Sequence, residues 1–206
     1  MSECTGQATV FVVDDDEAMR DSIQLLLESV HLNARTFSCV LDFMKCFDQT
    51  LEGCLLLDVR MPGMNGMELL EMLKSGGVDL PVVMITGHGD VPMAVRALKF
   101  GAFDFIQKPF NAQELLDRVQ AALEQDRKNS RRNSEIAQHR ALFQALTDRE
   151  MEVVDLVVAG NSSKMIAKAL GISPKTVDIH RANIMRKLNI RSVAEMVQLR
   201  LTLLDA

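Results

Sequence analysis

Residues 53–58 read Gly-Cys-Leu-Leu-Leu-Asp, a short apolar run that stops at one carboxylate, Asp58. Other apolar runs of the first half also stop at polar groups: Asp14, Asp15 and Asp16 follow residues 10–13, Thr86 follows 82–85, and Lys108 follows 105–107. Continuous apolar runs are typical of strands buried on both faces of a parallel sheet. All carboxyl ends of such strands lie at one edge, where ligands bind. The sequence therefore predicts that carboxylates, a hydroxyl and an ammonium group converge there.

The apolar runs alternate with amphipathic stretches between about residues 9 and 125. Strands are expected near 9–13, 33–37, 53–57, 81–85 and 103–106, with helices near 17–29, 40–47, 67–74, 91–100 and 112–123. Asp90 is expected to cap the fourth helix, which carries Pro92 in its first turn. Right-handed crossovers leave few topologies, and the pattern predicts an α/β fold with a doubly wound, five-stranded parallel sheet of the flavodoxin-like type.

Charge is divided unevenly along the 206 residues, a length that suits one large domain or two small ones. Residues 1–124 hold nine Lys and Arg against 19 Asp and Glu, a net of −10. Residues 125–206 hold 14 against nine, a net of +5. Chance drift of surface charge is one explanation. The other is an acidic domain joined to one that meets a polyanion.

Several kinds of site are disfavoured by the composition. The four cysteines include no Cys-x-x-Cys pair and the four histidines are scattered, so neither disulfides nor structural zinc are expected. No apolar run approaches the roughly 18 residues of a membrane helix, and the N-terminus does not resemble a signal peptide. We therefore expect a cytoplasmic protein without a membrane partner.

The last 60 or so residues carry helix signals alone and predict a smaller all-α, four-helix domain. Thr147 and Glu150 form a capping-box pattern, and Gly160 is expected to end that helix. A second helix, 163–170, stops at Gly171, and a third follows Ser173-Pro174 and runs to Leu188, with Asn189 suited to the left-handed position after it. Ser192 opens a final helix. The short glycine-containing turn indicates a helix-turn-helix. Residues 126–144 are polar and fit either a flexible linker or a helical extension.

The third of these helices has two distinct faces on a helical wheel. Val177, Ile184 and Leu188 share the side expected to face the core. The candidates for reading bases are Thr176, Asp178, Ile179 and Ala182, because a carboxylate can accept from cytosine and apolar groups can meet thymine methyls. The candidates for phosphate contacts are Lys164, Lys175, Arg186 and Lys187. A merely solvated basic face is the alternative.

The acidic landmarks of the first half suit phosphoryl chemistry. Magnesium prefers oxygen ligands, which Asp15, Asp58, Asp14 through water and the backbone carbonyl of Arg60 could supply. A carboxylate can be the nucleophile of phosphoryl transfer. Mg²⁺, Lys108 and Thr86 could each stabilise one equatorial oxygen of the transferred group. Taken singly, the Asp triplet could be a capping turn, and Asp58 or Lys108-Pro109 a surface turn; their joint occurrence at successive strand ends favours the site.

The motifs VVDDDE, LLLDVRMPGMNG, VVMITGHGDVPMAV and GAFDFIQKPF resemble the receiver domain of two-component response regulators over residues 8–125. The resemblance implies that Asp58 accepts phosphate from a sensor histidine kinase, that Asp14 and Asp15 bind Mg²⁺, and that Thr86 and Lys108 contact the phosphoryl group. It also implies that Phe105 is a conformational switch, and that the peptide bond after Lys108 is often cis.

Residues 145–206 are similar to the LuxR-type helix-turn-helix domain, with residues 126–144 as the linker. One departure is Ser163, where many members carry Asn. The order of the two domains resembles the FixJ-type branch of response regulators. The resemblance implies a protein that, once phosphorylated, dimerises, binds double-stranded DNA and activates transcription with RNA polymerase. The face around Val91, Pro92, Met93, Val95 and Phe110 is the expected homodimer interface.

Two other classes of function fit the sequence less well. A magnesium-dependent phosphatase or transferase with an aspartyl intermediate usually needs a carboxylate two residues after its nucleophile, but Arg60 stands there. An interaction protein with an inert acidic half would not need the intact set of Asp, Thr86 and Lys108. We therefore expect a regulator and not an enzyme.

Overall fold

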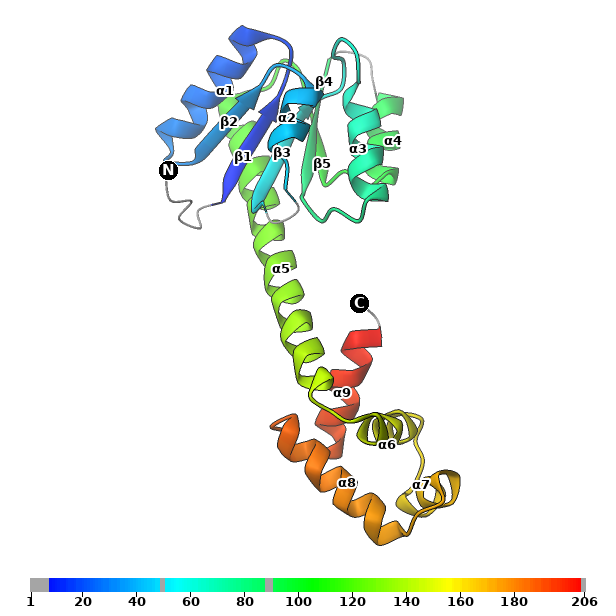
Figure 1. Cartoon of the computed structure of the whole chain (residues 1–206). Coiled ribbons are helices and arrows are strands. Elements are labelled where there is room, and N and C mark those ends of the chain that lie inside the picture. The colour runs from blue at the N-terminus through cyan, green and yellow to red at the C-terminus, as the bar shows by residue number, and fades with distance from the viewer. Residues whose placement is uncertain (1–7, 49–50, 88–90, 205–206) are drawn as a thin grey trace. The chain divides into compact units, whose positions relative to one another are not determined.

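The computed structural model describes residues 8–48, 51–87 and 91–204, and the chain divides into two compact units that meet at residues 130 and 131. The first unit is a five-stranded parallel sheet in the order β2-β1-β3-β4-β5 (Figure 1). Its strands are β1 (Thr9–Val13), β2 (Asn33–Phe37), β3 (Gly53–Asp58), β4 (Val82–Thr86) and β5 (Asp104–Gln107). Its helices are α1 (Glu17–Ser29), α2 (Val40–Cys46), α3 (Gly66–Ser75), α4 (Val91–Lys99) and α5 (Ala112–Gln144). The predicted doubly wound fold is confirmed.

Each face of the sheet has its own apolar core. The side chains of Phe11, Leu55 and Leu57 pack with residues of α2, α3 and α4. On the other face, Val10, Val12 and Leu56 pack with residues of α1 and α5. All six residues of β3 are buried, which explains why the central strand reads as a continuous apolar run.

The helices begin where short polar side chains can accept from free N–H groups. Asp16 accepts from the N–H groups of Ala18 and Met19 at the start of α1. Asn65 and Glu68 form a reciprocal capping box at the start of α3. The expected cap of α4, Asp90, lies outside the described residues.

Strand register places the functional side chains at one edge of the sheet. Val13 of β1 pairs with Leu57 of β3, so Asp14 and Asp58 follow at the same level. Asp58 pairs with Ile85 of β4, and Thr86 pairs with Gln107, the residue before Lys108. The strands therefore stop together, and their next side chains meet.

Helix α5 is longer than the predicted helix over residues 112–123. Residues 126–144, for which the sequence left two alternatives, continue it as one helix. Leu115, Val119 and Ala122 pack on the sheet. Asp126, 6% exposed, accepts a 2.8 Å hydrogen bond from the Gly53 N–H at the start of β3.

The second unit contains α6 (Asp148–Val158), α7 (Ser163–Leu170), α8 (Pro174–Lys187) and α9 (Val193–Leu204). Val177, Ile184 and Leu188 of the α8 region are at most 2% exposed, which confirms the predicted core face. The capping box of Thr147 and Glu150 is present. Asn189 has the left-handed φ of 53° expected of it.

Candidate functional site

Three carboxylates converge at the carboxyl edge of the sheet. Asp14 follows β1 and is fully buried, Asp58 ends β3 and is 6% exposed, and Asp15 is exposed. Each offers an oxygen atom within 4.8 Å of the oxygen atoms of the other two. The cluster joins two residues of one strand end to a residue more than 40 positions along the chain.

Lys108 bridges the two buried carboxylates. Its Nζ atom lies 2.7 Å from Asp14 Oδ2 and 2.9 Å from Asp58 Oδ1. The Lys108 backbone N–H donates to the Thr86 carbonyl at 2.7 Å, which ties the end of β5 to the end of β4. The Lys108-Pro109 peptide bond is cis.

Backbone N–H groups orient the second oxygen of each buried carboxylate. The Arg60 N–H donates to Asp58 Oδ2 at 3.0 Å, and the Asp16 N–H donates to Asp14 Oδ1 at 2.9 Å. Both side chains are therefore held by donors on both oxygens, so their positions are defined before any ligand arrives.

The electrostatics of the cluster are dominated by burial and by an excess of negative charge. Burial raises the pKa of Asp58, and Asp14 adds to this, while Lys108 and the Arg60 N–H act in the opposite direction without cancelling it. For Lys108, burial lowers the pKa, but the hydrogen bonds from Lys108 to Asp14 and Asp58 outweigh it, so the net shift is upwards. The cluster thus holds three carboxylates and one ammonium, which contacts two of them, and this excess of negative charge favours an additional cation.

The donor set fits Mg²⁺, because hard carboxylate oxygens grouped within one coordination sphere are what this ion takes. Asp14, Asp15 and Asp58 are the residues that could hold it. The structure shows the Arg60 N–H donating to Asp58. The Arg60 carbonyl as a further ligand stays a prediction.

Thr86 and Phe105 lie on the neighbouring strands. The Thr86 side chain is 4% exposed and its hydroxyl donates to the Gly87 carbonyl at 3.4 Å. Phe105 is half-buried and packs against the core on the α2, α3 and α4 face. Gly66 closes the loop after β3: a Cβ atom there would overlap the Asp58 carbonyl oxygen, so no larger residue fits without moving that strand end.

One contact of the site was not found from the sequence. Arg20 of α1 donates from Nη1 to the Asp14 carbonyl at 2.7 Å and so fixes the turn between β1 and α1. An arginine one turn into the helix after an acidic strand end is a weak signal, because its side chain could equally face solvent.

The second unit presents most of the predicted DNA contacts on its surface. Ile179 of α8 is 54% exposed, a large value for an isoleucine. The other exposed candidates are Lys164, Lys175, Asp178, Ala182 and Arg186. Met165 of α7, which the sequence did not single out, is another exposed apolar side chain, at 58%.

Two of the candidates, Asp178 and Thr176, have hydrogen-bond partners near the start of α8. Asp178 Oδ1 accepts from the Ser163 hydroxyl at 3.0 Å, and that hydroxyl accepts from Arg181 at 2.9 Å, which links α7 to α8. The Thr176 hydroxyl lies 2.8 Å from the Ser173 hydroxyl at the cap of α8. These contacts do not remove either side chain from a DNA contact, but such a contact would have to share or replace them.

Lys187, another candidate phosphate contact, has partners within the second unit. Its Nζ atom lies 2.6 Å from Glu150 Oε2 and 3.3 Å from the Ala145 carbonyl oxygen. Glu150 is 5% exposed, so the pair is part of the packing between α6 and α8. Charge alone made Lys187 a candidate, and charge does not distinguish a solvent-facing lysine from one paired with a buried carboxylate.

Comparisons with known proteins agree with this geometry. The family model described as the response regulator receiver domain matches residues 10–120, and that of bacterial regulatory proteins of the luxR family matches residues 144–200. The transcriptional regulatory protein TdiR of Thauera aromatica is 46% identical, over 94% of this chain and 86% of its own length.

Two solved structures share the fold over nearly the whole chain. The response regulator StyR has a TM-score of 0.80 and 44% identity, covering 94% of this chain and 98% of its own. Full-length FixJ from B. japonicum has a TM-score of 0.60 and 37% identity, covering 98% of this chain and all of its own.

The chain therefore belongs to the two-component response regulators that join a receiver domain to a LuxR-type DNA-binding domain. Members of this family are DNA-binding transcription regulators and not enzymes, and receiver domains bind Mg²⁺ at an acidic cluster such as that of Asp14, Asp15 and Asp58. Within the described ranges, no helix is long and apolar enough to cross a membrane.

Proposed function

We propose that a sensor histidine kinase phosphorylates this response regulator at Asp58, and that the phosphorylated form dimerises, binds double-stranded DNA and activates transcription with RNA polymerase. One observation carries the proposal. The Asp58 carboxylate is held at the carboxyl edge of the sheet by Lys108 at 2.9 Å and by the Arg60 N–H at 3.0 Å, beside two further carboxylates.

The chemistry required of Asp58 is a simple displacement. One carboxylate oxygen forms a bond to phosphorus while the bond between phosphorus and the donor histidine nitrogen breaks, and the imidazole leaves with that electron pair. Bound Mg²⁺ would supply neutralisation of the phosphoryl charge. The Lys108 ammonium lies next to Asp58 Oδ1 and can stabilise another oxygen of the phosphoryl group.

The output requires a conformational change, because an acyl phosphate on β3 does not itself touch DNA. The Thr86 hydroxyl has one long hydrogen bond of 3.4 Å, to Gly87, and can exchange it for a phosphoryl oxygen. Phe105 is half-buried on β5, the strand next to that of Thr86. Its side chain then moves in response to the movement of Thr86. In such a switch, the charge added by phosphorylation shifts the balance between two conformations of the domain.

DNA binding is assigned to the exposed faces of α7 and α8. The basic excess of residues 125–206, a net of +5, supports attraction to the phosphate backbone. Exposed Ile179 supports an apolar contact with bases, since such a side chain in solvent has no packing role.

Incubation with radiolabelled acetyl phosphate and Mg²⁺ tests the proposal. We expect stable labelling of one site per chain, its loss in Asp58→Asn, and its retention in the matched control Asp42→Asn, which changes a half-exposed carboxylate of α2. Beryllofluoride should shift the wild type to a dimer in light scattering at tens of micromolar. Labelling of Asp58→Asn would show that the acceptor is another residue, and repeated turnover would indicate an enzyme.

A further inference from the structure

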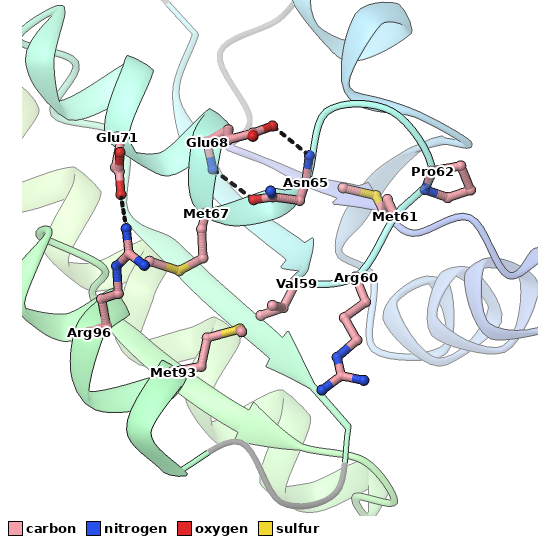
Figure 2. A pocket seen from close by; sticks show the side chains of 10 residues that line it. All are labelled: Val59, Arg60, Met61, Pro62, Asn65, Met67, Glu68, Glu71, Met93 and Arg96. Atoms are coloured by element: carbon pink, nitrogen blue, oxygen red, sulfur yellow. Dashed lines mark hydrogen bonds and ion pairs between the residues drawn. The ribbon is translucent and has the colours of Figure 1, made fainter.

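A pocket of about 760 Å³ lies beside the candidate phosphoacceptor site, between the loop after β3 and helices α3 and α4. Figure 2 shows the side chains of Val59, Met67 and Met93 turned toward one another, with Arg60 on one side and Arg96 on the other. The volume falls within the range of about 300–1,000 Å³ found for small-molecule sites. Neither the phosphoryl chemistry nor the expected DNA contacts use this space, although Met93 also belongs to the face expected to form the homodimer interface.

The floor of the pocket is apolar and adaptable. Val59, Met61 and Met67 are 5–8% exposed, and Met93 is half-buried. Methionine side chains adjust their shape readily, and their sulfur atoms make favourable contacts with aromatic rings. Three thioethers around one hollow therefore favour a flat aromatic body over a branched aliphatic one.

The polar side chains at the rim of the pocket leave more hydrogen-bond donors than acceptors for a ligand. Glu68 is engaged in the capping box with the Asn65 N–H, and Glu71 accepts from Arg96 at 3.1 Å. Both carboxylates of the rim thus already have partners. A guanidinium carries five N–H groups, and the structure shows the Arg96 guanidinium bound to Glu71 and 5.4 Å from the Phe100 ring centroid. These two contacts hold the group in place while most of its N–H groups remain to bind a further anion.

We propose that this pocket is a binding site for a planar aromatic carboxylic acid, with the ring system among Met61, Met67 and Met93 and the carboxylate on Arg96. A guanidinium already held in position binds a carboxylate with little further loss of side-chain freedom. The site is distinct from the acidic cluster, whose charge would repel such a ligand.

Binding is measured on the full-length protein with 2-naphthoate as the probe. Methyl-¹³C labelling of the 13 methionines gives separate NMR signals, which single Met→Leu variants assign. We expect saturable shifts at Met61, Met67 and Met93. Met72, exposed on α3 and not part of the pocket, is the internal control. Shifts spread equally over exposed methionines, or none at the three pocket residues, would overturn the proposal.

The chemical class of the ligand is tested separately. Arg96→Gln should weaken 2-naphthoate binding about tenfold, the effect of losing one charge-assisted hydrogen bond. It should leave the uncharged analogue 2-naphthylmethanol almost unaffected, and Arg96→Lys should be intermediate. Met93→Gln, similar in size but polar, should weaken both probes, whereas Met72→Gln should weaken neither. Equal affinity for the acid and the alcohol in the wild type would refute the role of Arg96.

The pocket is connected to Asp58 through consecutive residues, because Val59 and Arg60 line it and the Arg60 N–H holds Asp58 Oδ2. We therefore expect 2-naphthoate affinity to change at least about threefold when Mg²⁺ and beryllofluoride are added, and the probe to change beryllofluoride affinity by the same factor, as linkage requires. This coupling rests on the proposed function. If Asp58 is labelled normally and the probe affinity stays constant, the coupling is wrong while phosphorylation stands.

Discussion

Lys187 of α8 and Glu150 of α6 form an ion pair of 2.6 Å, although they are 37 residues apart. Glu150 Oε2 also accepts from the backbone N–H of Thr147 at 2.8 Å and from its hydroxyl at 3.1 Å. Lys187 donates in addition to the Ala145 carbonyl. The end of the predicted DNA-reading helix is thus fixed to the residues that open α6.

Lys187→Ala should therefore act on stability more than on phosphate contacts. The buried Glu150 would lose its cation, at a cost of about 1–3 kcal/mol in the free energy of unfolding. We expect a lower melting temperature of the second unit and weaker binding to all DNA sequences, with an unchanged salt dependence. Calorimetry measures the melting temperature, and DNA titrations at several salt concentrations measure the affinity and its salt dependence.

The matched control is Lys175→Ala, which removes an exposed lysine of the same helix. It should leave the melting temperature unchanged and reduce the slope of log affinity against log salt by about one. If Lys187→Ala gave the lower slope with full thermal stability, the lysine would be a phosphate contact as the sequence suggested.

Glu150 should make the second unit sensitive to acid. Burial alone raises the pKa of Glu150, but hydrogen bonds from Lys187 and Thr147 outweigh burial, and the net shift is below the usual value of 4.5. A carboxyl group with a lowered pKa in the folded state stabilises the fold above its unfolded pKa, and this contribution is lost as pH falls through the folded pKa.

The difference in melting temperature between wild type and Glu150→Gln should therefore be largest near neutral pH and should shrink below about pH 4.5. The control is Glu195→Gln, which alters the exposed carboxyl at the start of α9. A difference that grows with acidity would contradict the assignment.

Asp126 should show the opposite dependence on pH. Burial, the main cause, raises its pKa, and the Gly53 N–H opposes this only in part. Its contribution to stability is present below the unfolded pKa and is lost as pH rises through the raised folded pKa.

Asp126→Asn can still accept from Gly53 and carries no charge, so we expect it to match or exceed wild-type stability at pH 7. The advantage should vanish in acid. Asp126→Leu would leave the buried Gly53 N–H without its acceptor and should cost about 1–3 kcal/mol at every pH. Urea unfolding curves from pH 4 to 8 decide this, and a less stable Asn variant at pH 7 would show that the charge itself is needed.

Lys108 should compete with Mg²⁺ for the acidic cluster. The ammonium binds two of the carboxylates that the cation would use. A unit charge about 4 Å away is worth ~1–4 kcal/mol at effective dielectric constants of 80 to 20. Lys108→Met should then lower the Kd for Mg²⁺ about tenfold in calorimetric titrations.

For comparison, Lys45→Met removes an exposed lysine paired with Asp42 and should not change the Mg²⁺ affinity. Weaker Mg²⁺ binding by Lys108→Met would mean that the lysine positions the carboxylates, and that this role exceeds its charge repulsion.

Local features of this chain were predictable because their causes lie within a few residues. The apolar run before Asp58 predicted β3, and the Thr147 and Glu150 pattern predicted the start of α6. The meeting of Asp14, Asp58 and Lys108 also followed from the sequence, since parallel strands must end at one edge. Residues 126–144 could not be decided, because a polar segment has similar local preferences for helix and linker.

The sequence by itself determined the strands, the helices apart from the second half of α5, and the edge where the carboxylates meet, since each follows from short-range periodicity and the geometry of parallel strands. The tertiary structure alone decided that Lys187 faces Glu150, that Asp126 accepts from Gly53 and that three methionines surround one pocket. Lys187 and Glu150 are 37 residues apart, Asp126 and Gly53 are 73 apart, and Met93 comes 26 residues after Met67. The packing of whole helices against each other or against the sheet brings them together. The charge and hydropathy of single residues do not indicate which distant residues they will contact.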